Sequence, residues 1–145
     1  MLKELIENGL CSFYEKFDRW EDALRAAAEP LVKAGAVGPL YGESIIENVK
    51  KFGPYIVIAP DIAIPHAADP ANVYRTAVCF MKTRVPVVFD PENREKDVRL
   101  FFTLASCDEE EHLENMQALM ELFEDEEKMA RLAQAGGAEE VRALL

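Results

Sequence analysis

The chain has 145 residues, half of them hydrophobic, which is typical of a single domain that buries a core without disulfides or metals. Its 27 acidic and 16 basic residues give a formal net charge of -11, which argues against nucleic acid or an anionic membrane as a partner, since both attract a basic surface. No apolar stretch approaches the roughly 20 residues of a spanning helix, so no direct membrane insertion is expected.

The three cysteines, Cys11, Cys79 and Cys107, have no CxxC spacing, so neither a disulfide framework nor a zinc site is predicted. Cys79 and Cys107 lie in or beside apolar stretches and are expected to be small core residues. The N-terminal segment carries acidic residues in its first turn and no long apolar run, unlike a signal peptide. We therefore expect a cytoplasmic protein in a reducing compartment.

Two helices are predicted in the first third of the chain. Apolar residues recur at helical spacing from Trp20 to Ala34, with Asp18 as the expected N-cap. Pro30 is expected to bend or shorten this helix. A second helix is predicted from Tyr41 to about Lys51, where a Gly-Pro pair follows.

The middle of the chain predicts strands and the last third predicts helices. The β-branched and apolar runs that predict strands are residues 55–59, 62–64, 76–81 and 98–105. The last of these is nearly all apolar and is predicted to be central in its sheet. Helical spacing returns in residues 110–123, 125–133 and 138–145. Because no linker or repeat divides the chain, residues 1–145 are expected to form one layered α/β domain, a small mixed sheet flanked by helices.

The only two histidines follow strand ends, where ligand sites gather in open α/β sheets. His66 comes directly after Pro65, whose ring fixes the backbone and favours a rigid strand-to-loop corner. His112 lies at the start of a predicted helix, after the acidic run 108–111, whose charge is favourable there. A neutral imidazole is nucleophilic near pH 7 and can take up a phosphoryl group reversibly, although a lone histidine is more often a surface or packing residue.

The segment Phe52–Ala67 resembles the phosphorylation-site signature of the mannitol/fructose-type enzyme IIA family of the bacterial sugar phosphotransferase system (PTS). Its core, Ile62–His66, is highly specific. The Phe-Gly-Pro-Tyr run that opens the segment, together with Leu122–Glu127, is most similar to the ascorbate-type members. The resemblance covers nearly the whole chain and implies the mannitol-type enzyme IIA fold, a mixed β-sheet flanked by helices.

The resemblance also implies an activity, that of a phosphotransferase which carries phosphohistidine. His66 would accept a phosphoryl group from phospho-HPr and pass it to a cysteine of a cognate enzyme IIB, while His112 would help to hold the phosphoryl oxygens. The membrane enzyme IIC would be an indirect partner, and the transported sugar would be ascorbate or another pentose- or hexose-like substrate. No metal or organic cofactor is implied.

Two departures from the family pattern affect the expected site. Members usually carry Gly where this chain has Asp61, which tolerates left-handed backbone but adds a negative charge that we expect near the site. Ascorbate-type members typically carry Arg where this chain has Ala68, so an anion clamp is missing. The candidates to replace it are Arg75, Lys50 and Lys51, although each is more simply a solvated surface residue.

Two alternatives to a transport role remain open at this point. A regulatory enzyme IIA would use the same His66 chemistry to signal phosphorylation state by binding a target protein. A transfer-inactive interaction module would keep the fold and lack the chemistry. The sequence does not identify the sugar or the oligomeric state.

Overall fold

The computed structural model describes residues 1–145 and has its hydrophobic core divided between the two faces of one sheet. The helices are α1 (Leu2–Glu7), α2 (Trp20–Lys33), α3 (Tyr41–Phe52), α4 (Glu109–Glu124), α5 (Glu126–Gln134) and α6 (Ala138–Arg142). The strands are β1 (Cys11–Tyr14), β2 (Val57–Ala59), β3 (Asp61–Ala63), β4 (Ala77–Val87) and β5 (Val98–Ala105), with short 3-10 helices at Pro70–Asn72 and Arg94–Lys96.

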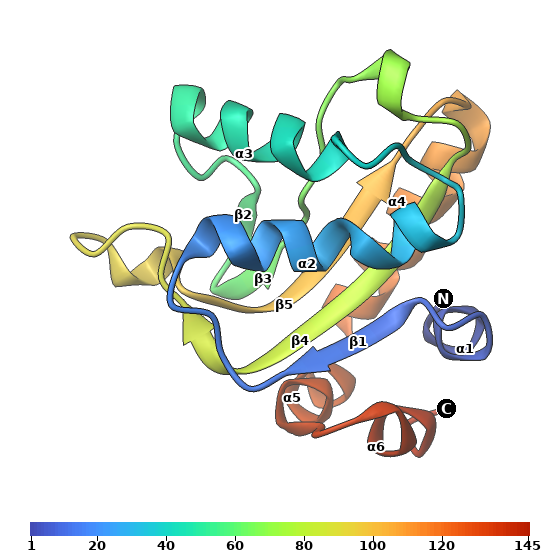
Figure 1. The fold of residues 1–145 in the computed structure, drawn as a ribbon. Coiled ribbons are helices and arrows are strands. Elements are labelled where there is room, and N and C mark those ends of the chain that lie inside the picture. Colours follow the sequence, from blue (N-terminus) through green and yellow to red (C-terminus); the bar gives the residue numbers. More distant parts are fainter.

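The helices form a layer on each face of the sheet (Figure 1). Side chains of α2 and α3 pack against Cys79, Met81 and Phe101 in one cluster. Helices α1, α4, α5 and α6 pack against Phe80 and Phe102 in the other. Successive residues of a strand point to opposite faces, so adjacent residues of β4 and β5 enter different clusters. The predicted single-domain layered α/β fold is confirmed.

The sheet is mixed, and its strand order is β1-β4-β5-β3-β2. Strand β4 is parallel to β1 and antiparallel to β5, while β3 is parallel to β5 and antiparallel to β2. Strand β5 is therefore central, as its apolar sequence predicts, and every residue but one in it is buried. No helix of the chain has the length and hydrophobicity needed to cross a membrane.

The predicted helices are all present, but two details of α2 differ. Its N-cap is Arg19 and not Asp18, because helical geometry begins at Trp20 and the residue before it has extended backbone. Asp18 lies 3.5 Å from the Lys16 ammonium group instead. Pro30 does not shorten the helix, since it lies in the last turns, where its carbonyl still accepts from Ala34 at 3.0 Å.

The strands differ more from the prediction than the helices do. Strand β5 has the predicted bounds, whereas β4 runs six residues past Met81 through the buried polar residues Lys82 and Thr83. Its register shifts before Val87, and this irregularity accommodates Pro86. Strand β2 is shorter than predicted because a turn precedes it, and the short elements β1 and α1 were not predicted.

The cysteine prediction is half right. Cys79 is fully buried, and its thiol donates to the Ala27 carbonyl at 3.1 Å. Cys107 is exposed, because the chain leaves the sheet after Ala105 and crosses the surface before α4 begins.

Candidate functional site

His66 lies where the chain leaves the sheet after β3. Beyond Ala63 the backbone continues along β5, with the Leu104 amide donating to the Pro65 carbonyl at 3.0 Å. Pro65 is buried and His66 is exposed. The imidazole is therefore presented to solvent directly after a paired and buried segment, which agrees with the rigid corner predicted from the proline.

The hydrogen bonds of the His66 ring define its tautomer. Its Nδ1 lies 2.7 Å from the Ile64 carbonyl oxygen. A carbonyl oxygen only accepts, so Nδ1 carries the ring proton and Nε2 carries the lone pair. Nε2 makes no hydrogen bond within the protein. The neutral ring thus has an oriented, unprotonated nitrogen available for nucleophilic attack.

Two tyrosines hold the backbone around His66. The Tyr55 hydroxyl donates to the His66 carbonyl, and the two rings meet edge to face with centroids 5.3 Å apart. Burial raises the pKa of Tyr55, so its hydroxyl stays protonated as a donor. The Tyr41 hydroxyl accepts from the amide of Ala67, the next residue, at 3.2 Å. Neither role is predicted from the sequence, where Tyr41 marks a helix face and Tyr55 a strand and the family signature, although a tyrosine in a buried pattern signals a hydroxyl that needs a partner.

His112 lies in the first turn of α4, and local bonds fix that turn. The Asp108 side chain caps the helix by accepting from the amides of Glu110 and Glu111 at 2.9 and 3.4 Å. The Thr76 hydroxyl, just before β4, accepts from the amides of Cys107 and Asp108 at 2.9 and 3.0 Å. The acidic run therefore begins a helix as predicted.

The parallel pairing of β3 with β5 brings both histidines to one edge of the sheet. Parallel strands end at the same edge, so His66 after β3 and the loop from β5 into α4 both lie there, on the upper side of Figure 1. We call this the carboxyl edge, made by residues 64–69 and 105–112.

The His112 ring is in the opposite tautomer to that of His66. Its Nδ1 is buried and has no hydrogen-bond partner. A buried N–H without an acceptor is rarer in proteins than an unpaired buried acceptor, so we infer that the neutral ring carries its proton on Nε2. The edge therefore carries one imidazole with a free lone pair and one with a free N–H donor.

The three cations proposed to replace the missing clamp lie in different places. Arg75 donates to the Ala34 carbonyl at 2.6 Å, at the end of α2. Lys50 lies near Glu21 and Glu43 and helps to lower the pKa of both carboxyl groups. Only Lys51 follows Ser44 by two helical turns, on one face of α3.

That face of α3 is the one next to His66. The Ser44 hydroxyl donates to Asp69, three residues after His66, at 2.5 Å. The Lys51 ammonium group lies 5.1 Å from the centroid of the Phe52 ring and forms no salt bridge. Lys51 therefore shares a face of α3 with Ser44, whereas Arg75 lies beside Thr76 and lines a hollow with Glu111.

The charge of Asp61 is not near the site, which corrects the expectation. Asp61 opens β3 and His66 follows its other end, so up to about 16 Å of extended chain separates them. Its φ of 73° is the left-handed backbone expected at this position. Its carboxylate accepts from Arg99 Nε at 3.0 Å and from the Arg99 amide at 2.9 Å. Arg99 is not among the predicted residues, and its signal in the sequence is a lone cation in an apolar strand.

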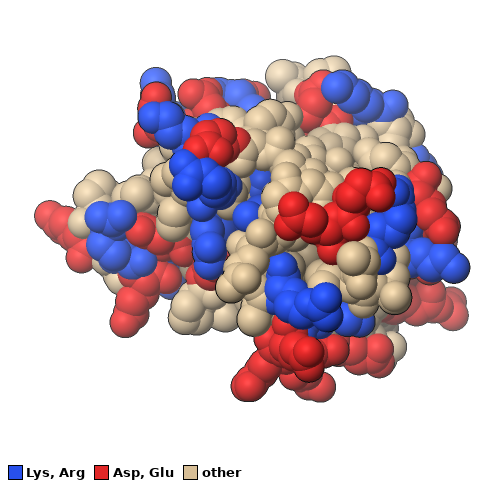
Figure 2. All heavy atoms as spheres, turned by 90° about the horizontal axis from the view of Figure 1, so that it is seen from below, with Lys and Arg blue, Asp and Glu red and all other residues tan.

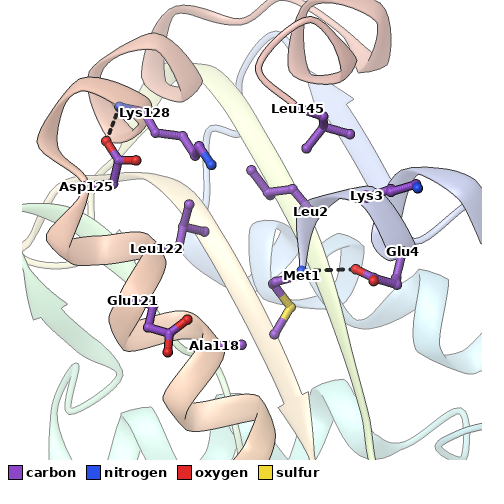
Figure 3. A pocket seen from close by; sticks show the side chains of 10 residues that line it. All are labelled: Met1, Leu2, Lys3, Glu4, Ala118, Glu121, Leu122, Asp125, Lys128 and Leu145. Atoms are coloured by element: carbon purple, nitrogen blue, oxygen red, sulfur yellow. Dashed lines mark hydrogen bonds and ion pairs between the residues drawn. The ribbon is translucent and has the colours of Figure 1, made fainter.

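Neither histidine lines the cavity shown in Figure 3 or belongs to a metal-binding group. The cavity of about 270 Å³ in Figure 3 is lined by residues of α1, α4 and the chain end, and by neither histidine. Figure 2, seen from below, shows the face turned away from the carboxyl edge, where acidic and basic side chains are interspersed without a broad basic patch. No group of three or more His, Cys, Asp or Glu residues is placed to hold a metal ion. The carboxyl edge thus carries one exposed and one partly buried imidazole, and a separate hollow of about 530 Å³ beside it includes Glu111.

Comparisons with known proteins show the family of this chain. The family model described as "Phosphoenolpyruvate-dependent sugar phosphotransferase system, EIIA 2" matches residues 4–145. The ascorbate-specific PTS system EIIA component of Escherichia coli (strain K12) is 32% identical over 142 residues, which are 97% of this chain and 92% of that protein. This relative confirms the resemblance to the ascorbate type.

Two solved structures carry the same fold. The mannitol-specific cryptic phosphotransferase enzyme IIA CmtB of Escherichia coli has a TM-score of 0.86 at 24% identity, covering 99% of this chain and 96% of that chain, and supports the fold alone. The mannitol enzyme IIA of Escherichia coli in its complex with phosphorylated enzyme IIB has a TM-score of 0.77 at 28% identity, covering 93% of this chain and 92% of that chain. From the family match and the ascorbate-specific relative, this chain belongs to the EIIA 2 family of the phosphoenolpyruvate-dependent sugar phosphotransferase system.

Proposed function

We propose that this chain is a cytoplasmic phosphoryl carrier that accepts a phosphoryl group from phospho-HPr on Nε2 of His66. It then passes the group to a cysteine of a cognate enzyme IIB during sugar uptake. The observation that carries this proposal is the bond between His66 Nδ1 and the Ile64 carbonyl, because it leaves the exposed Nε2 unprotonated and aimed away from the backbone.

The transfer balances without a further reagent. The Nε2 lone pair attacks phosphorus, the donor N–P bond breaks, and its electron pair returns to the donor imidazole. His66 keeps its Nδ1 proton, and the Ile64 carbonyl stabilises the positive charge that the ring gains. When a cysteine thiolate attacks phosphorus in turn, the N–P electrons return to Nε2 and the neutral ring is restored.

His112 complements this chemistry as a donor. Its Nε2–H would bond a phosphoryl oxygen, where negative charge must be held during both transfers. Removing a donor of this kind typically slows a reaction by about 10²–10³-fold. Lys51 would add a mobile positive charge on the same side, in place of the arginine missing at Ala68.

The partners follow from the relatives. Enzyme IIB is the proposed acceptor because the mannitol enzyme IIA, with a similar fold, forms a complex with phosphorylated enzyme IIB. Ascorbate is the proposed sugar because an ascorbate-specific component is 32% identical to this chain. Enzyme IIC would take part only through enzyme IIB.

The test is to locate the phosphoryl group and then to discharge it. The chain is incubated with phospho-HPr, and the adduct is mapped by mass spectrometry under alkaline conditions, in which phosphohistidine survives. We expect one phosphoryl group, on His66, and its loss to a candidate enzyme IIB. A label on another side chain would refute the site. A stable label that no enzyme IIB removes would favour the regulatory role, and no label at all would favour the transfer-inactive module.

A further inference from the structure

The hydrogen-bond ladder between the β3 segment and β5 is interrupted at His66 by a side chain. Strand β3 pairs in parallel with β5, with Ala63 opposite Phe101. Continued by three residues, this register places His66 opposite Leu104. In a parallel ladder, the N–H of a residue donates to the carbonyl of the residue before the one opposite it, and its C=O accepts from the amide of the residue after. Leu104 should therefore bond Pro65 through its amide and Ala67 through its carbonyl.

Only the first of these two bonds is direct. The Leu104 amide donates to the Pro65 carbonyl at 3.0 Å. The Ala67 amide donates instead to the Tyr41 hydroxyl at 3.2 Å, and that hydroxyl donates to the Leu104 carbonyl at 2.5 Å. The phenol oxygen thus lies between two backbone groups that would otherwise pair, and it satisfies both.

Tyr41 is suited to a permanent place in the ladder. Its side chain is 1% exposed, and burial raises its pKa to about 12, so the hydroxyl remains a donor at any physiological pH. It is the first residue of α3, whose apolar residues Ile45, Ile46 and Val49 are buried in the core. The helix therefore fixes the phenol ring, and its hydroxyl fixes the distance between the Ala67 amide and the Leu104 carbonyl.

We propose that Tyr41 is a positioning residue for phosphoryl transfer, because its hydroxyl spaces the chain after His66 away from Leu104 and so sets the direction of the imidazole. This inference rests on the proposed role of His66. Without the hydroxyl, the partly buried Ala67 amide and the buried Leu104 carbonyl lose their partner, and they recover a bond by closing the gap or by admitting water. Closing the gap draws the residue after His66 toward the sheet and turns the imidazole.

The test is Tyr41→Phe, which removes only the oxygen. Because the exposed surface is unchanged, we expect the KM for phospho-HPr to stay within about twofold while kcat falls roughly ten- to hundred-fold, as a displacement near 1 Å can produce. The amide signal of Ala67 and the ring nitrogen signals of His66 should shift in NMR spectra of the unphosphorylated protein. Unchanged kcat with unchanged His66 signals would overturn the proposal.

Leu132→Ala is the matched control for lost stability. Leu132 is fully buried in the cluster on the other face of the sheet, so this variant is destabilised while the Tyr41 bonds are intact. At a temperature well below the melting temperatures of both variants, Leu132→Ala should transfer at the wild-type rate. If both variants were slowed equally, Tyr41 would contribute only to stability.

Two further measurements keep the proposal testable in other cases. If Tyr41→Phe does not fold, the Ala67 amide of the wild-type protein must resist hydrogen exchange, and fast exchange there would refute the inserted bond. If wild-type protein takes no phosphoryl group, the proposed function fails by itself, and the NMR shifts of His66 still decide whether Tyr41 orients the ring.

Discussion

The two edges of the sheet use their polar residues in different ways. At the edge where β3 and β5 begin, Asp61 bonds Arg99, Glu15 bonds Arg84, and the buried Lys82 donates to the Ala135 carbonyl at 2.8 Å. At the carboxyl edge, Nε2 of His66 and the ring nitrogens of His112 make no hydrogen bond within the protein, while the backbone around both residues is bonded.

The edge where β3 and β5 begin thus stabilises the fold, and the carboxyl edge provides the residues for chemistry. A charge paired within the protein is unavailable to a ligand, and the partly buried pair of Asp61 and Arg99 contributes more to stability than the exposed pair of Glu15 and Arg84. At the carboxyl edge the hydrogen bonds hold the backbone around His66 and the first turn of α4. They therefore position the imidazoles without occupying the nitrogens that would face the phosphoryl group. The comparison predicts that changes at one edge alter transfer and changes at the other alter stability.

The largest effect is expected from His66→Ala. It removes the nucleophile, so labelling by phospho-HPr should fall to background, while the melting temperature changes little because the side chain is exposed. Quantitative mass spectrometry after a fixed incubation measures the first, and a thermal melt measures the second. Stoichiometric labelling of the variant would show that another residue carries the phosphoryl group.

His112→Ala should be the next largest. It leaves the nucleophile and removes the Nε2–H donor, so labelling still reaches completion but slows by about 10²–10³-fold. Single-turnover mixing with phospho-HPr resolves the rate from the end point. A wild-type rate in this variant would contradict the complementary tautomers and leave His112 as a helix residue only.

At the opposite edge, Arg99→Ala should cost stability and not transfer. The variant leaves the partly buried Asp61 carboxylate without its guanidinium, which we expect to lower the free energy of unfolding by about 1–3 kcal/mol. Urea titration measures this loss, and the labelling assay should give the wild-type rate. In an Asp61→Gly background, where Gly accepts the positive φ and no carboxylate remains, the same Arg99 change should cost much less. An equal cost in both backgrounds would mean that the pair contributes nothing.

The sequence predicts the elements whose signals are local. The helical spacing of α2, α3 and α4 and the apolar run of β5 repeat a single pattern over many residues, and the structure confirms them. Strand β1 has only four residues, and its place depends on pairing with β4. The extension of β4 depends on pairing with β1 and β5, and its buried Lys82 is satisfied by the distant Ala135 carbonyl. Partners so distant in the chain leave no pattern in one sequence.

The candidate site divides in the same way. Pro65 directly precedes His66, and an acidic run directly precedes His112. The neighbouring residues alone therefore predict that both histidines follow strand ends. The tautomers, the insertion of Tyr41 and the pairing of Asp61 with Arg99 depend on contacts between segments 26 to 63 residues apart, or on burial, and only the folded chain defines them.

The smallest effect is expected from Asp108→Ala, which tests where the two roles meet. The side chain of Asp108 accepts from two amides at the start of α4, and loss of such a cap costs about 1 kcal/mol. Because His112 lies in that same first turn, its ring should become less fixed, and labelling should slow by a few-fold at most, well short of the loss from His112→Ala. Asp125→Ala removes a similar cap at the start of α5, far along the chain from the histidines, and is the matched control. If both variants lose the same stability and only Asp108→Ala slows transfer, the first turn of α4 serves the chemistry as well as the fold; if neither slows, the turn holds His112 without this cap.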